Sequence, residues 1–157
     1  MKVAFDTSVV VAALVEPHPR HHRAICWITA AAADSLTAEC SWHAVAETWS
    51  VLTRLPIDPP VSPSMAESAI ERLIRYVTPI ELSDKTYRAA MRRCAERGLR
   101  SGSVFDALHL VCAEIRGVDA FVTFNPGDFE RLSSSDGPPI LVPPDPPEVR
   151  LPGPARG

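Results

Sequence analysis

Short runs of valine, isoleucine and phenylalanine alternate along this chain with longer stretches in which apolar positions recur at helical spacing. Apolar runs bounded by turn residues predict strands, and the helical spacing predicts helices. Strands that alternate with helices predict an α/β fold, with a parallel sheet covered by helices on both faces. The predicted strands are residues 3–6, 35–38, 77–82, 120–124 and 139–142. The predicted helices are residues 8–15, 21–33, 41–53, 63–75, 83–97 and 103–116, the last ended by Gly117.

The proline content changes abruptly near the C-terminus. From Pro143 onward, six of fifteen residues are proline, and few are apolar. Such a segment lacks the apolar periodicity needed to pack on a core. The remaining length suits a single domain with a sizeable core. We therefore predict one domain over residues 1–142 and a disordered proline-rich tail over residues 143–157.

Overall charge gives little guide to function. Hydrophobic residues make up 46% of the chain and charged residues 22%, and the net charge is −3. These values are typical of a globular protein in solution. They do not indicate a nucleic-acid-binding protein, but an acidic metal site and a local basic strip can coexist in one chain.

Cysteine usage and hydropathy predict the compartment. The four cysteines form no Cys-x-x-Cys pair and no zinc-like group with the five histidines, which predicts free thiols in a reducing cytoplasm. Asp6 follows only three apolar residues, so we predict no signal peptide. No apolar run approaches the roughly 20 residues of a membrane span, so we predict no membrane association.

Oxygen-bearing residues stand on four separate predicted elements. Asp6 ends the first strand, Thr123 and Asn125 close the fourth, Glu47 lies within a helix, and Asp106 lies near the start of another. In open parallel sheets, ligands bind outside the carboxyl ends of the strands. These groups are therefore placed to converge on one hard cation such as Mg²⁺ or Mn²⁺, which prefers carboxylate and water oxygens.

Helix capping is the alternative explanation for three of these groups. Asp6 precedes a helix and can accept a hydrogen bond from its free N–H groups. Ser103 and Asp106 fit a variant of the capping box. Asn125, which a proline follows, fits the cap of a short helix that also holds Asp128. From the residues alone, both explanations stay open.

Glu47 lies in the middle of its helix, so capping does not explain it. That helix is apolar around most of its girth, which predicts a partly buried carboxylate in need of a partner. His43, four residues earlier, and Arg54 are candidate partners, and a shared metal ion is the alternative. Trp42 and Trp49 on the same helix are predicted to lie in the core.

Two further features have ordinary structural explanations. The segment 85–100 holds six basic residues against the single acid Glu96, which predicts a solvated helix face. Contact with a phosphate backbone near the following loop is the alternative. His109, one turn after Asp106, is predicted to pack or hydrogen-bond locally.

Four segments together resemble the PIN domain family, and within it the small VapC-type toxins of bacterial toxin–antitoxin pairs. They are FDTSVVVAAL, HHRAICWI, AVAETWSVL and SVFDALHLVCAEIRGVDAFVTFNPGDFERL. Each is weak alone, but their order is characteristic of the family. The resemblance extends over nearly the whole chain, up to about Val142.

The resemblance implies an α/β/α sandwich and a metal-dependent endoribonuclease that uses Mg²⁺ or Mn²⁺ to hydrolyse RNA. It also implies a VapB-like antitoxin as partner and a homodimer. Residue by residue, it assigns Asp6, Glu47 and Asp106 to the metal-binding set. Thr7 or Ser8, together with Thr123, would support that set as polar neighbours.

One position departs from the family pattern. Many members carry a fourth acid where this chain has Asn125. Asn125 offers a neutral oxygen, and Asp128 is a substitute from the following turn, so the number of metal ions stays open. A catalytically weak or inactive PIN-fold module that binds RNA or protein is the alternative function.

Overall fold

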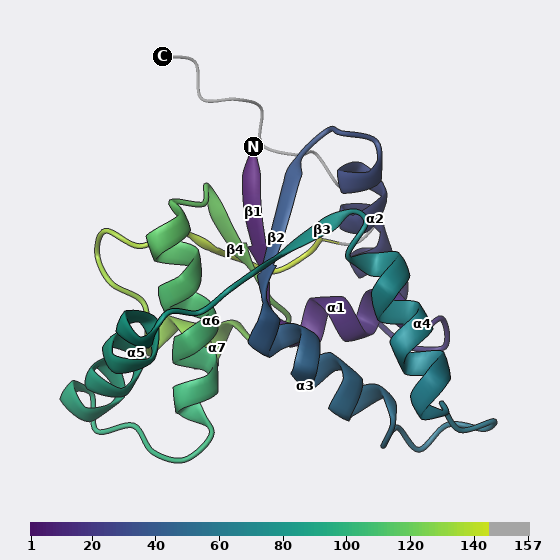
Figure 1. The fold of residues 1–157 in the computed structure, drawn as a ribbon. Coiled ribbons are helices and arrows are strands. Elements are labelled where there is room, and N and C mark those ends of the chain that lie inside the picture. The colour runs from purple at the N-terminus through teal and green to yellow at the C-terminus, as the bar shows by residue number, and fades with distance from the viewer. Residues whose placement is uncertain (145–157) are drawn as a thin grey trace.

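The computed structural model describes residues 1–144 and contains one parallel sheet in the order β3-β2-β1-β4-β5 (Figure 1). Its strands are β1 (Lys2–Phe5), β2 (Thr37–Ser41), β3 (Val77–Ile80), β4 (Ala120–Val122) and β5 (Ile140–Leu141). Its helices are α1 (Thr7–Leu14), α2 (His21–Ala32), α3 (Trp42–Leu52), α4 (Pro63–Leu73), α5 (Asp84–Glu96), α6 (Ser103–Arg116) and α7 (Pro126–Glu130). The predicted α/β class is confirmed.

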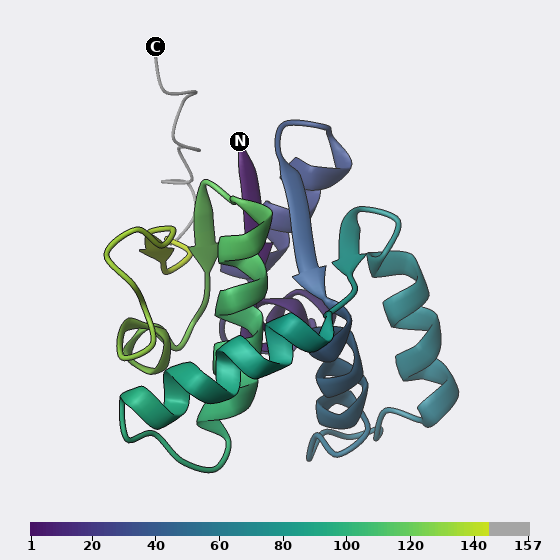
Figure 2. The same ribbon diagram turned by 60° about the vertical axis from the view of Figure 1, so that its left-hand side comes forward.

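Alternating side chains divide the core between the two faces of the sheet. On β1, Val3 and Phe5 pack into a cluster with α1, α2 and α4. Ala4 points the other way, into a cluster with α5, α6 and α7. This is the two-residue period of a strand buried on both sides. Figures 1 and 2 show the resulting layers, with helices on each side of the sheet. The predicted three-layer α/β/α sandwich is confirmed.

The strand order reverses beside β1. The chain builds β1, β2 and β3 outward in one direction and then returns to place β4 and β5 on the other side of β1. Ala4 of β1 pairs with Phe121 of β4 in parallel register. A reversal of this kind opens a crevice at the carboxyl ends of the two strands, which is where ligands bind in such sheets.

Most predicted elements lie within two or three residues of the observed ones. The clearest difference is β2, which was expected over 35–38 and runs instead to Ser41. The chain is still turning after α2 at Ser35, whose N–H donates to the Ala30 carbonyl. Strand pairing then continues as far as Ser41 opposite Ile80 of β3. Gly117 ends α6 in the left-handed conformation at φ 58°, as predicted.

The start of the predicted tail is packed. Pro143 is buried, and its carbonyl accepts hydrogen bonds from the Arg23 guanidinium, with Nε at 2.6 Å. The packed part of the chain thus extends past residue 142. The rest of the predicted tail, residues 145–157, lies outside the described residues.

The cysteines are free thiols, and three of the four are buried. Burial raises the pKa of Cys40 to about 12 and that of Cys112 to about 11. Both thiols are therefore protonated near neutral pH and are poor nucleophiles. Within residues 1–144, no helix is long and apolar enough to cross a membrane.

Candidate active site

Asp6 combines both roles suggested by its position. It directly follows β1 and is the N-cap of α1, where Oδ1 accepts a hydrogen bond from the Val9 N–H at 3.1 Å. Oδ1 also accepts from the Ser8 hydroxyl at 2.7 Å, and Oδ2 accepts from the Thr123 hydroxyl at 2.8 Å. The carboxylate is 3% exposed, and burial raises its pKa against the opposing effect of these hydrogen bonds.

Two hydroxyl groups join Asp6 to the loop after β4. The Ser8 hydroxyl accepts from the Phe124 N–H at 3.0 Å, and the Thr123 hydroxyl accepts from the Asn125 N–H at 2.9 Å. The ends of β1 and β4 are thus tied together at the point where the strand order reverses. Three hydrogen bonds to Asp6 leave part of its acceptor capacity for another ligand.

Glu47 reaches the same region from α3. Its Oε2 accepts from the Thr7 hydroxyl at 2.7 Å and lies 2.8 Å from His109 Nε2. Burial would raise the pKa of Glu47, but the hydrogen bonds from His109 and Thr7 outweigh it and lower the pKa. The carboxylate is therefore ionised and anchored through one oxygen.

The main histidine partner of Glu47 is not the one expected. The predicted His43 lies within the helix at the right spacing, but its Nε2 is 3.7 Å from Oε1. His109, expected to pack or hydrogen-bond locally, is packed in the interior but bonds to Glu47 from 62 residues away, so the expectation of a local hydrogen bond is wrong. Arg54 makes no described ion pair with Glu47. The carboxylate thus meets partners from α1 and α6, two of the helices that pack against α3.

Asp106 lies in the first turn of α6 and is half-buried. The capping box predicted with Ser103 is wrong, because Gly102 occupies the N-cap and no side chain caps the helix. Among the described residues, the Asp106 carboxylate has no hydrogen bond or ion pair. Burial raises its pKa to about 6, and the negative charges of Asp128, Glu47 and Asp6 add to the shift.

These three carboxylates, from β1, α3 and α6, line one open pocket of about 620 Å³ at the carboxyl ends of the strands. Its walls also hold two arginines, two histidines and the supporting hydroxyls. The lining residues are Asp6, Thr7, Ser8, Val11, His18, Arg20, Glu47, Ser50, Val51, Arg54, Phe105, Asp106, His109 and Asn125.

The acid set fits a hard divalent cation in charge and donor type. The pKa of Asp106 is raised partly by the negative charges of its acidic neighbours, and its carboxylate has no ion pair within residues 1–144, so a bound cation would relieve this repulsion. Among residues 1–144, no three His, Cys, Asp or Glu side chains form a ready-made metal cluster. Mg²⁺ suits such a site, because it is often held by one or two carboxylates and keeps several waters.

Asn125 and Asp128, the two candidates for a fourth ligand, are placed differently. Asn125 lines the pocket and occupies the N-cap position of α7, with Pro126 at the first helical position as predicted. Its side chain does not cap the helix, so that part of the prediction is wrong. Asp128 is about half exposed, pairs with Arg131 at 2.5 Å and is absent from the pocket lining.

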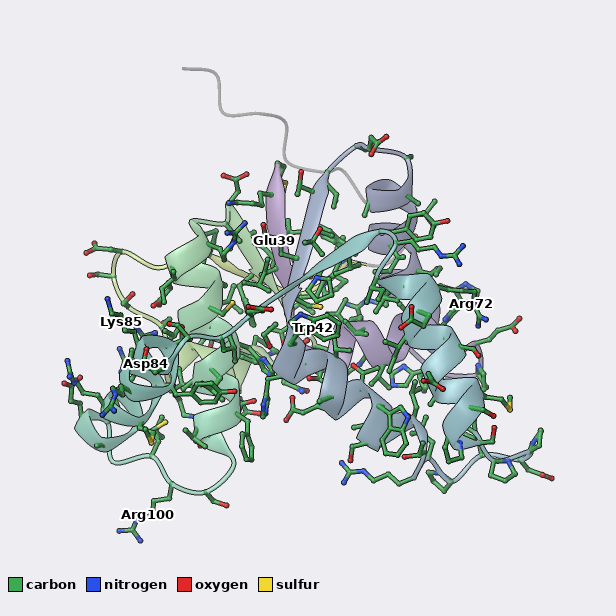
Figure 3. All side chains as sticks on the ribbon, in the orientation of Figure 1. Glu39, Trp42, Arg72, Asp84, Lys85 and Arg100 are labelled. Carbon is green, nitrogen blue, oxygen red and sulfur yellow. The ribbon has the colours of Figure 1, made fainter. Side chains whose placement is uncertain are left out.

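The positive charge in the pocket comes from isolated arginines. Arg20 donates to the Phe124 carbonyl at 3.2 Å and stacks on that ring, 5.1 Å from its centroid, while Arg54 reaches the pocket from the end of α3. The basic segment 85–100 contributes no lining residue. Its Arg93 instead binds Glu114 through two nitrogens, and Figure 3 shows Arg100 extending outward from the loop after α5. Arg20 had no sequence signal, and Arg54 was expected only as a candidate partner of Glu47.

The tryptophans of α3 are exposed, so their predicted place in the core is wrong. Trp42, at the start of the helix in Figure 3, is 45% exposed, and Trp49 is 42% exposed. The buried face consists instead of Ala44, Val45, Thr48 and Leu52. Because this helix is apolar around most of its surface, its sequence does not tell which side the sheet covers.

Comparison with known proteins agrees with this fold. The PIN domain family model matches residues 3–134, so the chain belongs to the PIN domain family. Ribonuclease VapC27 of Mycobacterium tuberculosis is 37% identical over 111 residues, which cover 71% of this chain and 76% of that protein.

Solved structures show the same architecture. VapBC2 from Rickettsia felis, bound to a promoter DNA fragment, matches with a TM-score of 0.65 and 18% identity, over 90% of this chain and 98% of that one. VapC20 of Mycobacterium tuberculosis, a Sarcin-Ricin loop cleaving toxin, matches with a TM-score of 0.65 and 20% identity, over 82% of this chain and 93% of that one.

Proposed function

We propose that this protein is an endoribonuclease that depends on Mg²⁺ or Mn²⁺. The observation that carries the proposal is the convergence of Asp6, Glu47 and Asp106 on one pocket at the switch point of the sheet. These carboxylates would hold the ion. Once bound, the ion would supply a Lewis acid that activates water and neutralises charge on the phosphate during hydrolysis. The family and the ribonuclease name of the 37% identical relative support the same activity.

The other walls of the pocket suit an RNA strand. Arg20 and Arg54 line the pocket and offer positive charge to the phosphates of a bound strand. Phe105 is 44% exposed and stacks on His43 with 5.0 Å between ring centroids. An exposed aromatic ring beside the acids is a surface on which an unpaired base can stack. Single-stranded or looped RNA therefore fits the pocket.

We further propose that the nuclease is the toxin of a VapBC-type pair. VapC27 and the VapBC complexes to which this chain is similar motivate this assignment. A free nuclease endangers its cell, so an inhibitory VapB-like antitoxin is the expected partner. The exposed Trp42 and Trp49 give α3 an aromatic surface of the kind enriched at protein interfaces, for the antitoxin or for a second copy in a homodimer.

Induced expression in a bacterial host tests the activity. We expect growth arrest and new RNA 5′ ends at defined positions, both lost in Asp6→Asn. Asp34→Asn is the matched control, because Asp34 is an exposed acid in the turn before β2, at the opposite edge of the sheet. Cleavage that persists in Asp6→Asn would contradict the proposal. Absence of cleavage by the wild-type protein would favour the inactive binding module, for which Asn125 is the sequence argument.

The partner is tested separately. Purification of the tagged protein from its native host should recover a small antitoxin that restores growth when both are expressed. A nuclease recovered without any such partner would overturn the toxin assignment and leave the nuclease assignment intact.

A further inference from the structure

Glu47 is held by a buried chain of hydrogen bonds that begins at the end of β2. His109 lies in the middle of α6 and is 4% exposed. Its Nε2 is 2.8 Å from Glu47 Oε2, and its Nδ1 is 2.9 Å from the Ser41 hydroxyl. Ser41 is itself 3% exposed and is the N-cap of α3, the helix that carries Glu47. This series of hydrogen bonds therefore joins α3 and α6, two helices of the site, to the end of β2.

The hydrogen bonds of this chain have one consistent direction. The Ala44 N–H donates to the Ser41 oxygen at 3.0 Å. The hydroxyl hydrogen of Ser41 is then free to donate to His109 Nδ1. With Nδ1 as acceptor, the ring proton lies on Nε2 and is donated to Glu47 Oε2, since a neutral imidazole has one donor and one acceptor nitrogen. Ser41 thus selects the tautomer that can bind the carboxylate.

This arrangement fixes one oxygen of Glu47 and leaves the other available. Oε2 accepts from both His109 and Thr7, whereas Oε1 has only His43 nearby, at 3.7 Å. A glutamate side chain has several rotatable bonds, and fixing them when a metal binds costs conformational entropy. A glutamate that is already held in one rotamer avoids this cost. With Oε2 anchored, Glu47 is suited to bind a cation through Oε1 alone.

We propose that Ser41 and His109 are positioning residues, which hold the Glu47 carboxylate in the orientation that binds the catalytic cation. The inference rests on the proposed metal-dependent activity. Neither residue would touch the ion. Loss of outer partners of this kind costs about 10–100-fold in metal affinity or activity at other metal sites, and we expect a loss in that range here.

Two amide substitutions at His109 test the roles of its two ring nitrogens separately. Glutamine places its amide nitrogen near the position of Nε2, so His109→Gln keeps a donor for Glu47. Asparagine reaches only as far as Nδ1, so His109→Asn keeps a partner for Ser41 and loses the donor for Glu47. Both variants place a polar amide side chain at the same buried position. A general structural role predicts equal effects, whereas positioning of Glu47 predicts rescue by glutamine only.

Ser41→Ala tests the other end of the chain. This change also removes a helix cap, which alone costs about 0.5–2 kcal/mol of stability. Ser62→Ala is the matched control, because Ser62 caps α4 by accepting from Met65 N–H at 3.2 Å and is absent from the pocket lining. We expect both variants to lose thermal stability and only Ser41→Ala to lose metal affinity.

The measurement is the dissociation constant for Mn²⁺ by electron paramagnetic resonance, made on folded protein and paired with the Mn²⁺ dependence of RNA cleavage. We expect a weakening of about 10-fold or more for His109→Asn, with His109→Gln within a few-fold of wild type. Equal affinity in His109→Asn, Ser41→Ala and the wild-type protein would overturn this inference alone. Wild-type protein that binds no Mn²⁺ would overturn the proposed function, and the inference with it.

Discussion

The Thr123 hydroxyl donates a 2.8 Å hydrogen bond to Asp6 Oδ2 across the point where the strand order of the sheet reverses. Both residues are buried, at 0% and 3% exposure. A buried carboxylate depends on internal donors in place of water. The position of Asp6 at the pocket is therefore set by the loop after β4 as much as by β1.

Removal of the Thr123 hydroxyl should destabilise the protein without leaving a cavity in the core. We expect Thr123→Val, which keeps the shape, to cost about 1–3 kcal/mol, because it takes one donor from the buried Asp6 carboxylate and the acceptor from the Asn125 N–H. Thr48→Val is the matched control, since Thr48 is equally buried and bonds only to the Ala44 carbonyl of its own helix. Denaturant unfolding measures both. A larger loss in Thr48→Val would contradict the role of Thr123.

Asp106→Asn should stabilise the metal-free protein in a pH-dependent manner. The folded-state pKa of Asp106 is raised to about 6 from an ordinary value of 3.8, so the native state holds this proton more tightly than the unfolded chain. Wild-type stability therefore falls as pH rises from about 4 to about 6, and the full penalty is present above that range. The asparagine variant lacks this penalty.

Thermal unfolding in EDTA from pH 4 to pH 8 measures this difference. We expect Asp106→Asn to melt above wild type at pH 7 and the two curves to converge toward pH 4. The exposed Asp34→Asn should show no such trend. A constant offset between Asp106→Asn and wild type at all pH values would show that the carboxyl is not perturbed.

A fourth acidic residue can be introduced at position 125, where many PIN domains carry one. Asn125 lines the pocket, so Asn125→Asp adds a charge there and should lower the Mg²⁺ concentration needed for half-maximal cleavage. Asp128→Asn is the comparison, and we expect it to raise that concentration by a smaller factor, because Asp128 pairs with Arg131. A larger effect of Asp128→Asn would place Asp128, not position 125, at the metal.

Arg54→Ala should weaken RNA binding more than catalysis. We expect a higher KM with little change in kcat, because Arg54 is placed to meet a phosphate beside the acids. The slope of log affinity against log salt should fall by about 0.7, the value for one phosphate contact on a single strand. Arg72→Ala is the control, on the exposed side of α4 (Figure 3). Equal effects of the two variants would remove Arg54 from the interface.

The strands of the sheet and the three acidic residues of the pocket could be predicted from the sequence. Asp6 ends a strand, Asp106 begins a helix, and Glu47 is a charge in an apolar helix, so each has a local signature. Parallel strands bring their carboxyl ends to one edge, and that rule places Asp6 there. Glu47 and Asp106 were joined to Asp6 by the resemblance to the PIN domain family.

Partners from distant segments could not be predicted in the same way. Nothing local marks His109 as the partner of Glu47, because the contact depends on how α3 and α6 pack together. Arg20 and Arg54 are single charges whose place in the pocket is set by the ends of helices. Trp42 and Trp49 were assigned to the core because the sequence gives the apolar residues of α3 but not the side that packing covers.

The most direct test is cleavage of a purified RNA by purified protein with its divalent cations controlled. The structure predicts cleavage that EDTA abolishes and that Mg²⁺ or Mn²⁺ restores, together with loss of cleavage in folded Asp6→Asn and its retention in Asp34→Asn. Cleavage that persists in EDTA, or that survives in Asp6→Asn, would contradict the assignment of these carboxylates as a metal-dependent ribonuclease site.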